Sequence, residues 1–223
     1  MSTTKITTTA RALRDLLTPV LALADKGDTL PVLECIRLRG HGSTMSAQAT
    51  DRYVAGMSRA SIAAPEKFEA LLPLRSAKAL LATFKVTRGH DPELELTFDG
   101  DTVHVETPGL SDAIAGARLG FRLYTTREYP ELDEVLREAF TGTGQAATNV
   151  SGALLESFKG ALRDGHPIRL HHNGLMRPTG VEIGDHFRGC IMPVRVADTA
   201  GHPLSGEWGR LVGAPTTAEA VSA

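Results

Sequence analysis

The sequence is poor in cysteine and has no long apolar run. Its two cysteines, Cys35 and Cys190, are far apart and neither has a close partner, so there is no disulfide framework and no zinc-ligand spacing. No apolar run approaches the length of a membrane span, and the N-terminal residues lack the apolar core of a signal peptide. These absences predict a soluble protein of the reducing cytoplasm.

Motifs of the common enzyme classes are missing as well. The sequence contains no G-x-G-x-x-G, no phosphate-loop G-K-[ST] and no G-x-S-x-G elbow. His166, His171 and His172 have no cysteine or acidic residue at ligand spacing, and adjacent strand residues point to opposite faces. Asp51 is explained by bonding to its own turn backbone. A hydrolase that uses these residues is the weakest hypothesis; we expect no enzyme activity, no metal and no cofactor.

Composition predicts a globular protein with a substantial core. The chain has 223 residues, of which 42% are hydrophobic and 22% are charged, enough for one large domain or two small ones. The formal net charge of -2 argues against a wholly basic nucleic-acid-binding protein. It leaves room for a local basic face on an acidic body.

A pattern of one helix followed by about three strands occurs three times, as a structural rather than a sequence repeat. In the first unit, Thr8 or Thr9 can cap the helix, Pro19 should kink it and Gly27 can end it. The second unit contains a hairpin that turns at Asp99-Gly100. The expected strands and helices of the three units cover 8–27, 35–39, 44–50, 53–62, 68–74, 75–85, 93–107, 112–125, 152–165, 167–172, 175–183 and 187–196. Helices packed on antiparallel strands make an α+β fold.

Four stretches of sequence occur in an informative order. They read TLPVLECIRL (29–38), ATDRYVAG (49–56), REYPELDEVL (127–136) and LMRPTGVEIGDHFRGCIMPVRV (175–196). Taken in order, they resemble the first strand, a strand–turn–strand, the interdomain connector and the C-terminus of the bacterial DNA sliding clamp, the β subunit of polymerase III. The C-terminal stretch is the most specific, because its M-P-x-R motif follows a helix and two strands.

The resemblance implies a shortened sliding-clamp fold of about one and a half clamp domains, a compact format that would suit a phage. A clamp domain contains two helix–strand units, and this chain has three. We therefore expect a complete clamp-like domain over 1–123, a connector over 124–140, a C-terminal half domain over 141–198 and a flexible tail over 199–223.

Basic residues on the expected helices are candidates for DNA binding. Lys78 and Lys85 are seven residues apart, and Lys159 and Arg163 are four apart, so each pair would share a helical face. From the spacing alone, ordinary solvated charge is the better explanation. Clamps touch DNA phosphates with their helices, so the resemblance assigns that role to Arg11, Arg14, Arg75, Lys78, Lys85, Lys159 and Arg163.

Clamps also bind short peptides in an apolar pocket between domains. The proline in the last predicted strand fits such a place, because an edge that faces a ligand needs no ladder donor. The matching residues here are Leu33, Thr50, Tyr53, Val54, Ala55, Pro130, Val135, Leu175, Met176, Met192, Pro193, Val194 and Arg195. For Leu33 and Val135 an ordinary core position is an equally good interpretation. Arg52 and Val54 depart from the usual clamp residues.

The resemblance predicts a clamp-like processivity factor that holds double-stranded DNA non-specifically and tethers a polymerase. It needs no cofactor, is located in the cytoplasm with the nucleoid, and contacts polymerase and clamp loader through clamp-binding peptides. Self-association into a homo-oligomeric ring would complete the half domain. The alternative hypothesis is a binding module without a ring, which captures or diverts replication proteins.

Overall fold

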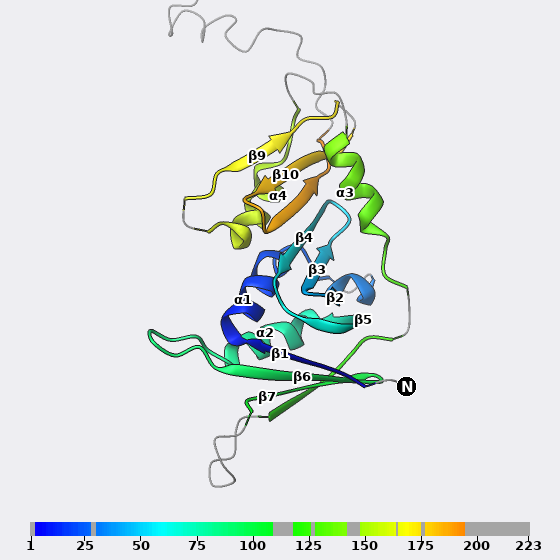
Figure 1. Cartoon of the computed structure of the whole chain (residues 1–223). Helices are drawn as coiled ribbons and strands as arrows, with labels where there is room; N and C mark the ends of the chain where they lie inside the picture. The colour runs from blue at the N-terminus through cyan, green and yellow to red at the C-terminus, as the bar shows by residue number, and fades with distance from the viewer. Residues whose placement is uncertain are drawn as a thin grey trace, which may run out of the picture.

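The structure, a computed structural model, contains two antiparallel sheets with helices packed on them (Figure 1). It describes residues 3–27, 30–108, 118–125, 128–141, 148–163, 165–174 and 177–194. The predicted tail over 199–223 lies outside the described residues. Within the described ranges, none of the helices combines the length and the hydropathy of a membrane-spanning segment.

The smaller sheet has the strand order β1-β6-β7-β8. Its strands are β1 (Thr4–Thr9), β6 (Glu93–Asp99), β7 (Thr102–Glu106) and β8 (Arg118–Arg122). The hairpin predicted at Asp99-Gly100 is confirmed, and Gly100 takes a positive φ of 58° in its turn. β1 was not predicted, since its threonines mask the alternation in which Thr4, Ile6 and Thr8 are buried.

The larger sheet has the strand order β5-β2-β3-β4-β11-β10-β9, so the third unit extends the sheet of the first. Its strands are β5 (Ala64–Pro73), β2 (Cys35–Gly42), β3 (Thr44–Thr50), β4 (Val54–Ala60), β11 (Phe187–Ile191), β10 (Thr179–Ile183) and β9 (Ile168–His171). β4 and β11 form the joint, with Val54 opposite Ile191 and Gly56 opposite Gly189. A Cβ at Gly56 would lie 2.6 Å from both Leu23 and Phe187, so close packing explains this glycine.

Helices from all three units form one row along the core face of the sheets. They are α1 (Ala10–Leu17), η1 (Thr18–Val20), α2 (Leu74–Thr83), α4 (Gly152–Glu156) and η3 (Ser157–Ala161). Thr9 caps α1 as predicted, because its Oγ1 accepts from Ala12 N at 3.2 Å. The helix ends well before Gly27, since Pro19 turns the chain into the short 3-10 segment η1. α1 contacts α2, and η1 contacts η3.

The opposite face of the seven-stranded sheet carries α3 (Leu132–Thr141), which contacts β4, β10 and β11. The 3-10 segment η2 (Pro31–Glu34) precedes β2. Leu132, Leu136 and Ala139 of α3 are buried together with Ala55 and Cys190 in a small cluster, separate from the main core on the helical side. The connector therefore covers one end of this face of the seven-stranded sheet, which we call the outer face. Residues of both β4 and β11 lie under the connector.

Candidate functional site

An apolar cleft of about 350 Å³ lies beside the start of α3, where β3 and β11 end and β4 begins. Segments far apart in the sequence meet there: η2, the β3–β4 turn, the connector and the residue after β11. The cleft is lined by Leu30, Val32, Leu33, Thr50, Arg52, Tyr53, Val54, Ala55, Pro130, Leu132, Val135, Cys190 and Met192. Apolar walls with few polar groups are typical of sites that take an apolar ligand.

The β3–β4 turn forms one rim of the cleft and is held by its own side chains. Asp51 Oδ1 accepts from Tyr53 N and Val54 N, each at 2.9 Å, as predicted for a turn aspartate. Thr50 Oγ1 donates to Val54 O at 2.8 Å and accepts from Arg52 N at 3.0 Å. Arg52 has a φ of 80°, which is costly for a side-chain-bearing residue. This turn presents Tyr53, whose exposed fraction is 59%.

The end of β11 forms the second rim. The strand stops at Ile191, and Met192 N donates to Tyr53 O at 3.0 Å, which ties the chain to the β3–β4 turn. Pro193 lies beyond the last ladder residue, so its missing N–H leaves no ladder bond unmade. Met192 lines the cleft with 38% of its surface exposed.

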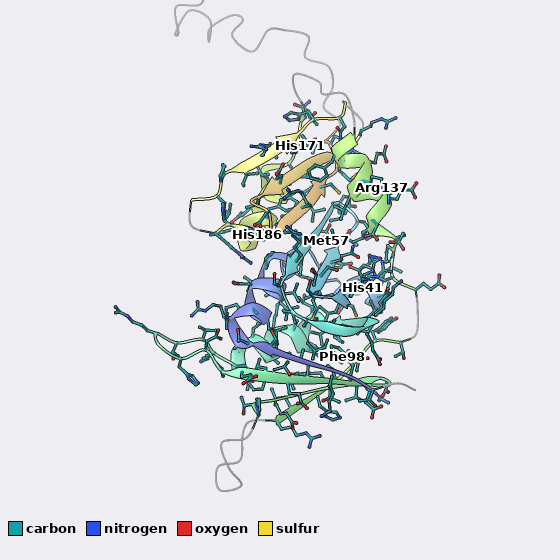
Figure 2. All side chains as sticks on the ribbon, in the orientation of Figure 1. His41, Met57, Phe98, Arg137, His171 and His186 are labelled. Carbon is teal, nitrogen blue, oxygen red and sulfur yellow. The ribbon has the colours of Figure 1, made fainter. Side chains whose placement is uncertain are left out.

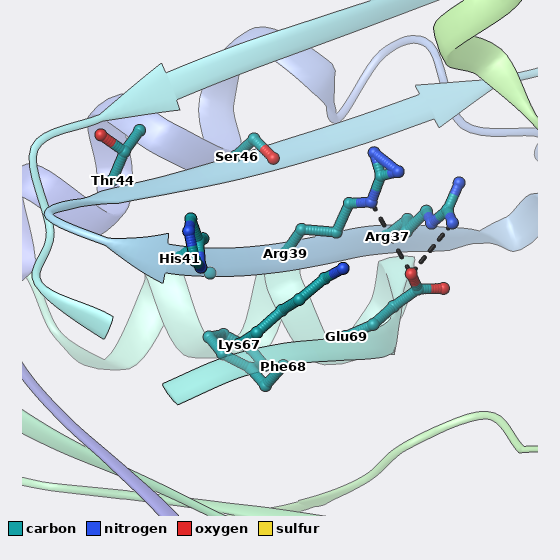
Figure 3. Close-up of a pocket in the computed structure, with 9 residues that line it drawn as sticks. Arg37, Arg39, His41, Thr44, Ser46, Lys67, Phe68 and Glu69 are labelled. Carbon is teal, nitrogen blue, oxygen red and sulfur yellow. Dashed lines mark hydrogen bonds and ion pairs between the residues drawn. The ribbon is translucent and has the colours of Figure 1, made fainter. Parts of the chain in front are cut away.

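The connector forms the third wall, and ion pairs fix it to the outer face of the sheet. Arg39 Nη1 donates to Asp133 Oδ2 at 2.6 Å, and Gln48 Nε2 donates to Asp133 Oδ1 at 2.7 Å. Arg37 donates to Glu131 Oε1 at 3.3 Å and to Glu69 Oε2 at 2.9 Å. Both arginines and Glu69 line a neighbouring groove of about 960 Å³. Figure 3 shows both arginines reaching Glu69. Leu132 and Val135 are thereby placed over the cleft.

Two buried ionisable groups beside the cleft remain in their neutral forms. Burial raises the pKa of the Cys190 thiol to about 11. Burial also raises the pKa of Tyr129, whose hydroxyl donates to Gln48 O at 3.5 Å and whose ring lies 5.8 Å from the Arg37 guanidinium carbon. Neither group is therefore an anionic nucleophile at neutral pH.

The structure brings most of the predicted pocket residues together. Those that line the cleft are Leu33, Thr50, Tyr53, Val54, Ala55, Pro130, Val135 and Met192. Pro193 and Val194 follow Met192 but are not among the described residues that line it, and Leu175, Met176 and Arg195 lie outside the described residues.

Sequence reasoning missed several residues that line the same cleft. They are Leu30, Val32, Arg52, Leu132 and Cys190. Alternation along the last strand would have indicated Cys190, which is two residues before Met192 and on the same face. The helical spacing of Leu132 and Val135 would have indicated Leu132.

The predicted DNA-binding residues differ in whether their side chains already bond to other parts of the protein. Arg14 donates to Leu81 O at 2.8 Å, which joins α1 to α2. Arg163 lies beyond η3, which ends at Ala161, so the predicted helical face shared with Lys159 is wrong; Arg163 donates to Asp15 O at 3.0 Å. Lys85 was expected two helical turns after Lys78, but α2 ends at Thr83 and that placement is wrong. The chain leaves the helix at Phe84, whose φ of -92° and ψ of 81° are not helical, although its N–H still donates to Leu80 O.

The other four predicted residues are exposed on helical segments of the three units. Arg11 lies 3.6 Å from Asp91. Arg75, Lys78 and Lys159 make no ion pair with any residue in the described ranges. These three residues therefore remain candidates for the predicted DNA contact.

The three histidines considered for catalysis do not form one group. His171 Nε2 lies 2.8 Å from Glu182 Oε2, whereas the ring of His166 lies 5.5 Å from that of His186. Figure 2 shows His171 and His186 well apart. No three histidine, cysteine, aspartate or glutamate residues gather as a metal site within the described parts of the chain. The hydrolase hypothesis gains no geometric support.

No protein-family model matches the sequence, and a comparison with curated proteins finds no match. Solved structures do match the fold. The DNA polymerase sliding clamp of Bacillus subtilis has a TM-score of 0.66 at 15% identity, over 86% of this chain and 64% of the clamp. The polymerase III β subunit of Thermotoga maritima gives 0.67 at 13% identity, over 87% and 66%.

The sliding clamp of Pseudomonas aeruginosa gives a TM-score of 0.68 at 12% identity, over 86% of this chain and 67% of the clamp. The chain is therefore an α+β protein with the sliding-clamp fold, as the sequence predicted. It spans about two thirds of the length of these clamps. Its three helix–strand units correspond to about one and a half clamp domains.

Proposed function

We propose that this chain is a clamp-like processivity factor that holds duplex DNA non-specifically and tethers a polymerase through the cleft. The observation that carries the proposal is the cleft, where η2, the β3–β4 turn, the connector and Met192 converge. The similarity of the fold to DNA polymerase sliding clamps supports the same assignment.

The chemistry of the cleft suits a short peptide that carries leucine or phenylalanine. Leu33, Val54 and Val135 offer apolar contact, whereas Arg52 offers polar contact at one rim. Methionine is unbranched and adapts to different partners, so Met192 suits a site that binds several replication proteins in turn. Tethering by such a peptide raises the local concentration of the polymerase at its template.

The helical row supplies the DNA contact in this proposal. Arg75, Lys78 and Lys159 are exposed and unpaired within the described ranges, and they come from two different units of the chain. Contacts of lysine and arginine with phosphates are independent of base sequence and permit sliding. The protein acts without a cofactor, and it works as a homo-oligomeric ring beside the nucleoid.

A DNA-retention assay with charge-reversed variants tests this proposal. Lys78→Glu combined with Lys159→Glu should lower duplex affinity at least about 10-fold, because each lost phosphate contact weakens binding. The matched control is Lys67→Glu, an exposed lysine on the outer face of β5, which should leave DNA affinity unchanged.

Binding of a fluorescent peptide with leucine and phenylalanine is measured on the same variants and should not change. Peptide binding without any DNA retention in the wild-type protein would contradict the processivity role and support the non-ring module. A wild-type protein that shows neither peptide binding nor DNA retention would contradict both the processivity role and the non-ring module.

A further inference from the structure

We propose that Arg52 is a specificity residue of the cleft and that it selects peptides with an acidic side chain beside their apolar residues. This inference rests on the proposed function, because it concerns the ligand of the same cleft, and it goes further by naming a charge that the ligand carries. Arg52 departs from the residue usual in clamps at this place in the turn. The selection is therefore a property of this chain and does not follow from the resemblance to clamps.

Arg52 is the one charged residue among the described residues that line the cleft. The rest of the lining is apolar except for Thr50, Tyr53 and Cys190. The Arg52 side chain is exposed, and within the described ranges its guanidinium makes no ion pair and no hydrogen bond. An apolar cleft with a single unpaired cation at its rim favours a ligand that combines apolar groups with one negative charge.

The acidic residues close to the cleft are already engaged elsewhere. Asp51 Oδ1 accepts from two amides of its own turn, and Asp51 is not part of the lining. Glu131 and Asp133 of the connector bond to the two arginines of β2. The positive charge of Arg52 is therefore not balanced within the described lining, and the carboxylate that would balance it has to come from the ligand.

The backbone at Arg52 is held in a conformation that favours glycine. Its φ of 80° is the only positive φ outside glycine in the described chain. The turn maintains this conformation, because Thr50 Oγ1 accepts from Arg52 N at 3.0 Å and Met192 N ties the turn to the end of β11. Unfavourable backbone that the surrounding structure maintains is typical of functional positions. Glycine would relieve the strain but would remove the only charge from the lining.

The chemistry of the guanidinium group identifies the class of ligand. Its planar fork of N–H donors matches both oxygens of a carboxylate, and such charge-assisted bonds are about twice as strong as neutral ones. The apolar walls at Leu33, Val54 and Val135 exclude water around a bound peptide, which strengthens the pair. An aspartate or glutamate can supply the carboxylate at any position along a peptide, whereas a C-terminal carboxylate would require the peptide to end at Arg52. The ligand is therefore a peptide segment with both acidic and apolar side chains.

Peptide titrations in matched pairs test the proposal. Each peptide carries leucine and phenylalanine, has an amidated C-terminus and contains one asparagine, whose position differs from peptide to peptide; its partner has aspartate at that position. At one position or more, the wild-type protein should bind the aspartate peptide about 10-fold more tightly, and this preference should shrink as salt is raised.

The outcomes of these titrations separate this proposal from the proposed function. Wild-type protein that binds the peptides without an aspartate preference at any position would overturn the role of Arg52 and leave the tethering cleft standing. Wild-type protein that binds none of the peptides would contradict both.

Variants of Arg52 assign the preference to this side chain. Arg52→Gly fits the backbone of the turn, so it should melt at or above the temperature of the wild type. It should bind the asparagine peptides within about twofold of the wild type and lose the aspartate preference. Arg52→Lys should keep part of the preference, because lysine retains the charge without the planar fork.

Arg88→Gly is the matched control, because Arg88 is an exposed arginine in a turn and does not line the cleft. It changes the net charge by the same amount and should keep the full aspartate preference. An aspartate preference that survives in Arg52→Gly would assign the selection to another cation and overturn the proposal.

Discussion

Asp133 accepts hydrogen bonds from both terminal nitrogens of Arg39, at 2.6 and 2.9 Å on the same carboxylate oxygen. Its other oxygen accepts from Gln48 Nε2 at 2.7 Å, and Gln48 is 0% exposed. Asp133 stands in the first turn of α3, between Leu132 and Val135, which line the cleft. One carboxylate thus connects β2, β3 and the connector, and it holds one wall of the cleft in place before any ligand arrives.

Replacing Asp133 should therefore affect both stability and the cleft. Asp133→Ala removes the carboxylate acceptor of the buried Gln48 Nε2 and leaves it only the weak acceptor Met57 Sδ, at 3.4 Å. We therefore expect a loss of about 1–2 kcal/mol in the free energy of unfolding. Peptide affinity should also fall, because α3 loses its anchor. The control is Glu134→Ala, an exposed neighbour with no ion pair in the described structure. Equal effects of the two substitutions in denaturant melts would contradict an anchoring role for Asp133.

The joint between β4 and β11 predicts a strong effect at Gly56. A methyl group there would clash with Leu23 and Phe187, so Gly56→Ala should destabilise the protein by about 1–3 kcal/mol. Gly152→Ala is the matched control, because a Cβ at Gly152 meets nothing within 4 Å at the start of α4. Thermal melts of both variants check this, and a Gly56→Ala protein as stable as the control would mean that the joint packs differently.

Cys190 should react slowly with thiol reagents. Burial raises its pKa from 9.0 to about 11, which lowers the thiolate fraction at pH 8 about 100-fold. Alkylation followed by mass spectrometry should show this slowing or more, since the side chain is only 2% exposed. Peptide bound in the cleft should slow the reaction further. Labelling of Cys190 at the rate of a free thiol would contradict the closed floor of the cleft.

Acid should weaken the contact between β9 and β10 through Glu182. A hydrogen bond with His171, together with Arg188 and Arg169, lowers the pKa of Glu182 from its ordinary value of 4.5. The ionised carboxylate therefore stabilises the fold above that value, and this contribution is lost as the pH falls through the lowered pKa. In acid titrations, Glu182→Gln should remove part of the pH dependence below 4.5. Glu66→Gln, an exposed control, should leave the wild-type curve unchanged.

The local elements of the fold could be predicted from the sequence because their signals are short-range. The threonine cap before α1, the Asp99-Gly100 turn and the alternation of Ile36 and Leu38 each depend on residues a few positions apart. β1 was not predicted because its inward residues include threonines that become buried only when β6 pairs with it. Helix α1 was predicted too long, because the apolar stripe continues past the proline that ends it.

The candidate site was predictable where the resemblance gave an ordered motif, and not where it depends on distant pairing. Met192 and Tyr53 were both proposed, yet only the register between β4 and β11 explains why they bond to each other. No sequence pattern indicated that Arg37 and Arg39 would hold the connector. The alternation of apolar and polar residues in CIRLR would place Arg37 and Arg39 on the solvent-exposed face of a strand, whereas Arg37 is buried under the connector.

The measurement that tests the account most directly compares Met192 and Val194 in a peptide titration. The two side chains are similarly exposed, at 38% and 41%, but only Met192 lines the cleft in the described structure. Met192→Ala should weaken binding of a peptide with leucine and phenylalanine about 10-fold, a loss of about 1.4 kcal/mol. Val194→Ala should stay within about twofold of the wild type. Equal losses, or no peptide binding by the wild-type protein, would contradict the assignment of this cleft as the tethering site.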